Sequence, residues 1–400
     1  FNRTSATKIT ELSNSKLVTN KLFAINLAKH NITPAYKLFK DTFEEYINAD
    51  DALLRKSGIE ILSHFPDKFL LDHQQEIVGF CFSEYKEVRE AIQPTMERLV
   101  KLDAKFKLSL LDKLLLVLTE AETYEGLHEN SYQLLTAYFK DSLSTLSEDQ
   151  IFQFVLSDYE FAQNLGTPLF DYKIQLSIIS IPKLVKLANS PVFSIRKKVQ
   201  DYFEKNSIKI NYELEEALYI FNTTWQDVIE WACVYFDKNI DSENWTPDLL
   251  LYVCDNVKTA VQAFGMRMIT KHFSNEKGLY LLEKLQEHPT KEMQFFVTNY
   301  LNAYAKDNLK VILELEDYFR TSLFNINTNR ATKTRIYAFL EQEATKDEAV
   351  AKMTINIISS ILDTKTITDR SKNIDILLEI AGSFPGLEIP LSIKTTADEV

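Results

Sequence analysis

Histidine and cysteine are the residues of this chain that can most directly act as metal ligands, general bases or nucleophiles. The six histidines are spread along the sequence: His30, His64, His73, His128, His272 and His288. None is spaced from another histidine or from a cysteine as metal ligands are. The single His–carboxylate neighbour pair, His128 and Glu129, occupies adjacent positions, which do not face one another in a helix. The sequence therefore predicts no metal site and no catalytic histidine.

Other catalytic signatures are also missing from the sequence. The eight glycines are scattered, so there is no Gly-x-Gly-x-x-Gly, no phosphate loop and no Gly-x-Ser-x-Gly. Cys81, Cys233 and Cys254 each lie in an apolar helical context, which predicts buried free thiols in a reducing, cytoplasmic compartment. We therefore expect a protein that is not an enzyme and that binds no cofactor.

Charge is more informative than these absent motifs. From Asp201 to Asn256 there are 12 acidic and three basic residues, which account for −9 of the formal net charge of −12. Residues 172–200 carry six basic residues and no acidic one: Lys173, Lys183, Lys186, Arg196, Lys197 and Lys198. Each run is either a solvated helix face or part of a dipolar surface that attracts oppositely charged partner segments. The acidic total argues against nucleic acid as a partner.

Three tryptophans fall close together in the acidic stretch, among Tyr235, Phe236 and Tyr252. They are interpreted either as core packing or as an exposed aromatic platform for a peptide, because Trp and Tyr are favoured interface anchors. With the basic run, they complete the set of candidate partner-binding residues: Lys183, Lys186, Arg196, Lys197, Lys198, Trp225, Trp231 and Trp245.

The elements that must position these residues are helices. The 400 residues include only 8 glycines and 10 prolines but 45% hydrophobic residues, which leaves few tight turns. Apolar residues recur at three- and four-residue spacing almost throughout, and this predicts a nearly all-helical chain. No run of about eighteen apolar residues occurs, so no helix is expected to span a membrane.

The stretch from Asn244 to Phe273 shows the predicted building unit. Thr246 and Pro247 are expected to begin a helix. The first backbone N–H groups of a helix have no partner within it, so a threonine hydroxyl can accept a hydrogen bond from one of them, and proline leaves no N–H unpaired because it has none. Two apolar faces at helical spacing follow, separated by a polar turn: Leu249, Leu250, Val253 and Cys254, then Val261, Phe264, Met268 and Ile269. We predict a helical hairpin that can bury these faces only against neighbouring hairpins.

The hairpin pattern recurs along the chain. Aligned on the first apolar residue of the returning helix, four copies fall at Val88, Ile195, Val261 and Met293. Their separations of 107, 66 and 32 residues are close to three, two and one multiples of about 33–36 residues, the size of a two-helix repeat. A charged or amide residue follows each of these positions: Arg89, Arg196, Gln262 and Gln294.

These features resemble the HEAT and armadillo-like α-solenoid repeats over residues 16–380. The likeness is carried by the first-helix leucines (Leu184-Val185-Leu187, Leu249-Leu250-Val253), the short Ser/Asp/Pro turn and the Val/Ile-rich second helix. It implies an all-α fold, a right-handed α-α superhelix of about ten helical hairpins. The Trp-Thr-Pro-Asp-Leu-Leu sequence at Trp245 also looks like that of bacterial HEAT-repeat accessory subunits that accompany ATPases.

Two places interrupt the helical pattern. Gly166, Thr167 and Pro168 predict a division of the solenoid into residues 1–165 and 166–381. Residues 382–400 form a different tail, in which alternating apolar residues over 387–394 predict a strand or the start of a further domain. The chain begins at Phe1 rather than at a methionine, so we expect it to be a fragment of a longer protein.

The expected function is a non-enzymatic scaffold for protein–protein interaction, or a subunit of a larger assembly, that binds another protein or a peptide along the solenoid surface. Two alternatives stay open. One is a HEAT-like nucleic-acid binder or enzyme with a basic concave groove, and the other is a helical regulatory domain of a longer multidomain protein.

Overall fold

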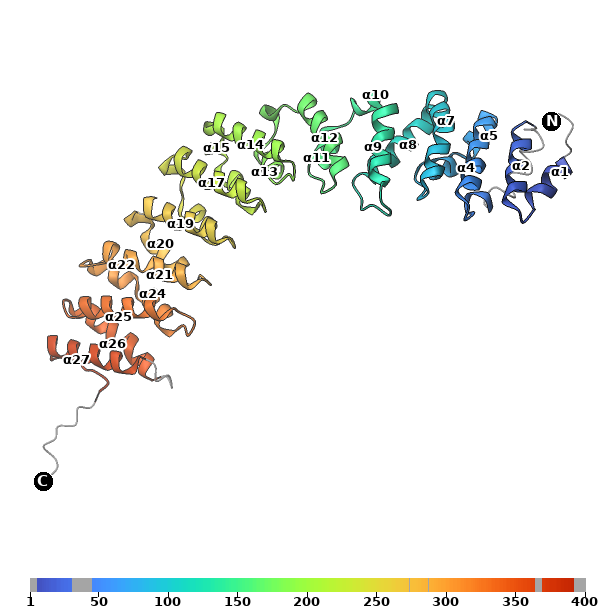
Figure 1. Ribbon diagram of the computed structural model, residues 1–400. Helices are drawn as coiled ribbons and strands as arrows, with labels where there is room; N and C mark the ends of the chain where they lie inside the picture. Colours follow the sequence, from blue (N-terminus) through green and yellow to red (C-terminus); the bar gives the residue numbers. More distant parts are fainter. Residues whose placement is uncertain (1–5, 31–44, 273, 287, 364–368, 392–400) are drawn as a thin grey trace. The chain divides into compact units, whose positions relative to one another are not determined.

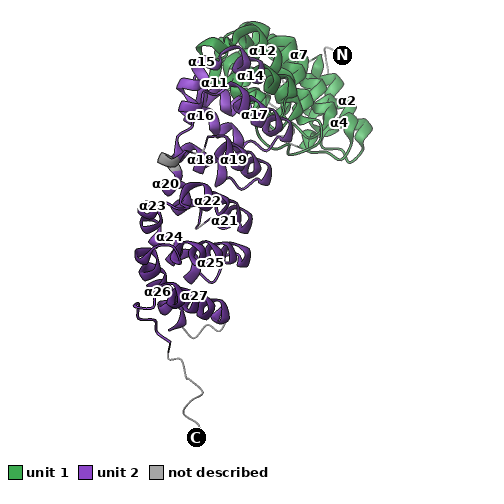
Figure 2. Cartoon of the chain, turned by 90° about the vertical axis from the view of Figure 1, so that its left-hand side faces the viewer, with its two compact units in different colours: residues 1–179, 190–198 green, residues 180–189, 199–400 purple. Residues whose placement is uncertain are grey.

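The computed structural model describes residues 6–30, 45–272, 274–286, 288–363 and 369–391, which form helices joined by turns (Figure 1). Two compact units share the chain: unit 1 comprises residues 1–179 and 190–198, and unit 2 residues 180–189 and 199–400 (Figure 2). No strand occurs in the described ranges. The prediction of an all-α array of helical hairpins is confirmed there, whereas the right-handed sense of the superhelix stays a prediction.

Unit 1 contains α1 (Ala6–Ser13), α2 (Val18–Lys29), α4 (Ala52–Glu60), the 3₁₀ helix η1 (Ile61–His64), α5 (Asp67–Asp72), α6 (Gln74–Cys81), α7 (Lys86–Leu102), α8 (Ala104–Val117), α9 (Leu127–Tyr138), α10 (Lys140–Leu143), α11 (Glu148–Val155), α12 (Glu160–Lys173) and η2 (Leu176–Ile178). The sequence after Thr33-Pro34 also predicts a helix that ends near Ile47, and most of it falls on residues 31–44, outside the described residues.

Unit 2 contains α13 (Ile181–Leu187), α15 (Ser207–Tyr212), α16 (Leu214–Leu218), η3 (Tyr219–Asn222), α17 (Gln226–Asn239), η4 (Ser242–Asn244), α18 (Pro247–Cys254), α19 (Thr259–His272), α20 (Asn275–Leu285), α21 (Lys291–Val297), α22 (Asn299–Tyr304), α23 (Leu309–Glu314), α24 (Glu316–Phe324), α25 (Arg330–Ala344), α26 (Glu348–Leu362) and α27 (Arg370–Ser383). Helix α14 (Phe193–Lys205) has residues in both units. Every helix in the described ranges is too short or too polar to traverse a lipid bilayer.

The hairpin of α18 and α19 forms as its sequence predicts. The Thr246 side chain accepts a hydrogen bond from the N–H of Leu249, and Pro247 is the first helical residue. The inward residues of both helices are buried: Leu250, Val253, Cys254, Val261, Phe264, Met268 and Ile269. Leu249 is only half-buried. Ser147 and Gln150, three residues apart, have the sequence pattern of a capping box, and α11 begins with that capping box.

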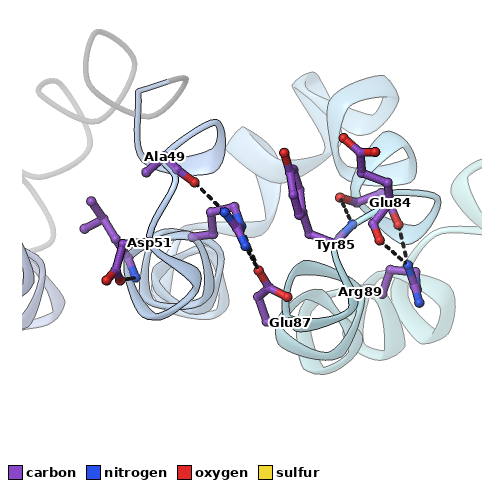
Figure 3. Close-up of polar contacts among 9 residues, drawn as sticks. Ala49, Asp51, Glu84, Tyr85, Glu87 and Arg89 are labelled. Atoms are coloured by element: carbon purple, nitrogen blue, oxygen red, sulfur yellow. Dashed lines mark hydrogen bonds and ion pairs between the residues drawn. The ribbon is translucent and has the colours of Figure 1, made fainter.

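A shared hydrogen-bonded clamp closes several hairpin turns. The side-chain amide of Gln262 donates to the carbonyl of Asn256 (2.8 Å), while Asn256 Oδ1 accepts from the N–H of Lys258 (2.9 Å). The same side-chain-to-carbonyl bond joins Arg89 to Ser83, Gln163 to Ser157, Arg196 to Ser190 and Gln294 to His288 (Figure 3 shows Arg89). The charged or amide residue of each repeat therefore satisfies a turn carbonyl that has no partner within a helix.

Further hydrogen bonds fasten each turn to the preceding hairpin. In unit 2 they join His288 to Cys254 O (3.1 Å), Lys258 to Phe221 O (2.8 Å) and the N–H of Asn329 to Gln294 Oε1 (3.2 Å). The residues in these pairs are 34, 37 and 35 positions apart in sequence. Consecutive turns of unit 2 consequently lie next to one another and form one continuous edge.

The predicted interruption at Gly166 is wrong, because α12 runs from Glu160 to Lys173 without a break and holds Pro168 in its interior. Gly166 serves a different purpose. A Cβ atom there would lie 2.6 Å from the Cβ of Phe154 and 3.0 Å from the backbone nitrogen of Val155. Glycine therefore lets α12 approach α11 closely.

The tail does not form the predicted strand in its described part. Helix α27 ends at Ser383, and residues 384–391 are turns and irregular backbone. The remainder of the alternating segment, from residue 392, lies outside the described residues.

Candidate interaction surfaces

The predicted basic run is divided between the two units. Lys183 and Lys186 belong to unit 2, whereas Lys197 and Lys198 belong to unit 1. Lys186 and Lys197 are exposed and the other two are half-buried. Lys198 forms an ion pair with Asp171. Binding of a partner by these four lysines stays a prediction.

Arg196 is corrected from a surface candidate to a structural residue. Only 6% of it is exposed. Its guanidinium donates to the carbonyls of Ser190 (2.9 Å) and Pro191 (3.0 Å), and lies 5.5 Å from the centroid of the Phe193 ring. Because its donors are directed into its own turn, Arg196 acts as the turn clamp of this hairpin.

Trp245 is likewise corrected, because it is a core residue with 0% exposure. Its ring stacks on that of His272, with the centroids 6.1 Å apart, and meets Phe264 edge-on. The three tryptophans therefore do not form one exposed platform. This outcome matches the core-packing interpretation for Trp245.

Trp225 and Trp231 are half-buried in unit 2 and combine packing with an accessible edge. Trp231 stacks on Tyr235 at a centroid distance of 5.1 Å and donates its indole N–H to Glu204 (2.9 Å). Trp225 donates its indole N–H to the carbonyl of Asn189 (3.0 Å). Each ring is thus fixed in place, which lowers the entropy that binding at its exposed edge would cost.

The three cysteines are buried free thiols, as predicted. Burial raises the pKa of Cys81 and of Cys254 to about 12, and that of Cys233 to about 11. Each thiol therefore stays protonated at neutral pH and is a weak nucleophile. Across the described part of the chain, no group of three or more His, Cys, Asp or Glu residues is placed to hold a metal ion.

Sequence reasoning missed the tips of the turns in unit 2. Val257 is 90% exposed and Ile326 is 89% exposed, and Pro289, at the tip between them, is also exposed. We call these three residues the turn-tip ridge. In unit 1 the exposed residues at equivalent tips are acidic: Glu84 and Asp158. The signal in the sequence is an apolar residue directly after the polar residue that opens each of these three turns, as in Asn256-Val257.

Comparison with known proteins adds no family assignment. No protein-family model matches the chain, and no curated protein sequence matches it either. A crystal structure of an engineered protein is 12% identical, with 94% of this chain and 98% of that chain covered and a TM-score of 0.24. A second structure, described as showing tubulin recruitment and assembly by microtubule polymerases with TOG domain arrays, is 12% identical, with 92% and 99% covered and a TM-score of 0.30.

Proposed function

We propose that this chain is a non-enzymatic interaction subunit of the HEAT-like class that docks a protein partner on the turn-tip ridge. The observation that carries the proposal is the near-complete exposure of Val257 and Ile326 at equivalent places in two turns. An aliphatic side chain that is exposed in this way contributes almost nothing to the stability of its own fold, whereas its burial by a partner is favourable. Aligned apolar tips are therefore suited to a protein interface.

The edge that carries the turn-tip ridge is held rigidly. Lys258 fastens the turn of Val257 to the previous hairpin, His288 fastens the turn of Pro289, and Asn329 fastens the turn of Ile326. A surface that is already ordered loses little conformational entropy when it binds. Half-buried Trp225, in the turn before Val257, extends the ridge with an aromatic ring of the kind that anchors interfaces. The buried thiols fit a reducing compartment such as the cytoplasm.

Site-specific photo-crosslinking tests this function. Benzoylphenylalanine is introduced separately at Val257 and at Ile326, and at the exposed Ala349 as the control position. We expect both ridge positions, but not position 349, to crosslink the same protein in the native host. The protein that is identified, once purified, should bind the wild-type chain and lose at least tenfold in affinity for the Val257→Asp/Ile326→Asp variant. Crosslinking at the ridge that is no greater than at position 349 would overturn the proposal.

A further inference from the structure

A second surface of unit 2 is formed by tyrosines on three consecutive first helices. Tyr219 (47% exposed) begins η3, half-buried Tyr252 lies on α18, and Tyr280 (39% exposed) lies on α20. We call these residues the tyrosine face. It lies on the helices rather than on the turns, and is therefore distinct from the turn-tip ridge.

Contacts between the three helices make the tyrosine face continuous. The rings of Tyr219 and Tyr252 meet edge-on, with their centroids 5.5 Å apart. The Tyr280 hydroxyl donates to Asp248 Oδ1 (2.7 Å), which lies on α18. The Tyr252 hydroxyl is in turn the acceptor for the side-chain amide of Asn222 (3.4 Å). The aromatic rings and one carboxylate are thus held in a fixed arrangement before any partner arrives.

Carboxylates border the tyrosine face on two of its helices. Glu215 and Glu216 are exposed on α16, which continues into η3, and lie four and three residues before Tyr219, while Asp248 is exposed on α18. Lys284 is an exposed base at the other end of the face, where its Nζ lies 5.8 Å from the centroid of the Tyr280 ring. The end of the face around Tyr219 and Tyr252 is therefore both aromatic and acidic.

We propose that the tyrosine face docks an arginine- or lysine-rich segment of a protein partner. A guanidinium or ammonium group is attracted to the face of a tyrosine ring and forms charge-assisted hydrogen bonds with carboxylates, so both features of the surface favour the same ligand. An acidic segment or a nucleic acid would be repelled by Glu215, Glu216 and Asp248. A purely apolar segment would bury these carboxylates without partners, which is costly.

Fluorescence anisotropy with a defined probe tests this proposal. The probe is a fluorescein-labelled twelve-residue peptide of alternating arginine and serine, with glutamate in place of arginine in the comparison peptide. Glu215→Gln/Glu216→Gln removes two charges from the face, and Tyr219→Leu removes a ring but keeps an apolar side chain. Glu314→Gln/Asp317→Gln removes two exposed charges from α23 and α24 in the same unit and serves as the matched control.

We expect the arginine peptide to bind the wild-type chain and the glutamate peptide not to bind. The Glu215→Gln/Glu216→Gln variant should weaken binding about fivefold or more, and Tyr219→Leu about threefold, while the control stays within twofold. If the control variant lost as much affinity for the arginine peptide as Glu215→Gln/Glu216→Gln does, the peptide would be attracted only by the overall negative charge, and the proposal would be overturned. Unchanged affinity of Tyr219→Leu for the peptide would overturn it as well. The Val257→Asp/Ile326→Asp variant should bind the peptide normally, so a failure of the turn-tip ridge is distinguishable from a failure of this face.

Discussion

The guanidinium of Arg55 lies 3.9 Å from the centroid of the Tyr85 ring, which belongs to the next hairpin of unit 1. Arg55 also donates to the carbonyl of Ala49 in its own turn and, through Nε, to Glu87 Oε1 (2.7 Å) of that next hairpin (Figure 3). A single side chain therefore closes one turn and fastens the following one. Arg89 repeats the arrangement, since it clamps the turn of Ser83 and lies 5.1 Å from the Tyr124 ring.

The Arg55–Glu87 contact should make the stability of unit 1 depend on acid pH. Burial alone would raise the pKa of Glu87, but hydrogen bonds to its carboxylate and the charges of Arg55 and Arg89 outweigh burial and hold the pKa below the ordinary value of 4.5. The stabilisation is therefore complete above about pH 4.5 and is lost as the pH falls through the lower pKa of the folded state. Between pH 6 and pH 3, the melting temperature of Glu87→Gln should fall by less than that of the wild type, and thermal unfolding at the two pH values measures this. Glu90→Gln, at an exposed position of the same helix, should behave like the wild type.

Two glycines should respond to alanine in opposite directions. A Cβ at Gly265 would lie 2.7 Å from Cys254 Sγ and 3.1 Å from the Cys254 backbone nitrogen, whereas nothing lies within 4 Å at Gly79. Gly265→Ala should therefore lower the free energy of unfolding by about 1–3 kcal/mol through overpacking. Gly79→Ala, inside α6, should raise it by about 0.5–1 kcal/mol, because alanine favours helix. Urea denaturation followed by circular dichroism measures both, and equal effects would contradict the close approach of α18 and α19.

The turn clamp makes a third prediction, at Gln294. Its side chain donates to His288 O (2.8 Å) and accepts from the N–H of Asn329 (3.2 Å), and it is buried. Gln294→Ala should lower the free energy of unfolding by about 1–3 kcal/mol, because it leaves buried polar groups without partners. Gln342→Ala, at an exposed position of α25, should change it by less than about 0.5 kcal/mol. If the two variants unfold at the same temperature, the clamp does not stabilise the fold.

The thiols provide a test of the core. Burial raises the pKa of all three cysteines well above their ordinary value, so we expect almost no reaction of the native chain with an aromatic disulfide reagent at pH 8 over minutes. In denaturant three thiols should react at once. Fast reaction of even one thiol in the native protein would show that its hairpin opens readily.

Features set by neighbouring residues were predictable from the sequence. The cap at Thr246 and the capping box at Ser147 depend on residues three positions away. The spacing of the apolar residues determines which face of each helix is buried. Errors arose where a distant contact decides the role of a residue. Gly166 was interpreted as a helix breaker, but its missing Cβ makes room for Phe154.

The candidate site was less predictable than the fold, for a related reason. The charge of Arg196 predicts a surface residue, but its side chain is buried and its guanidinium donates to two turn carbonyls. Conversely, Val257 lies in the segment that the sequence predicts only as a polar turn between two helices. Its exposure follows from its position at the tip of a turn, one residue beyond a buried Asn256, and hydrophobic periodicity does not report that position.

The bonds that fasten each turn to the preceding hairpin have a mechanical consequence. In unit 2 they join residues 34 to 37 positions apart, so each holds closed a loop of about one repeat. When tension is applied to its ends, a chain built in this way should lengthen in discrete steps, because the bonds between neighbouring hairpins break one after another. Each step would release roughly 120 Å of extended chain. The array would thus act as an extensible tether that yields in equal increments and does not rupture all at once.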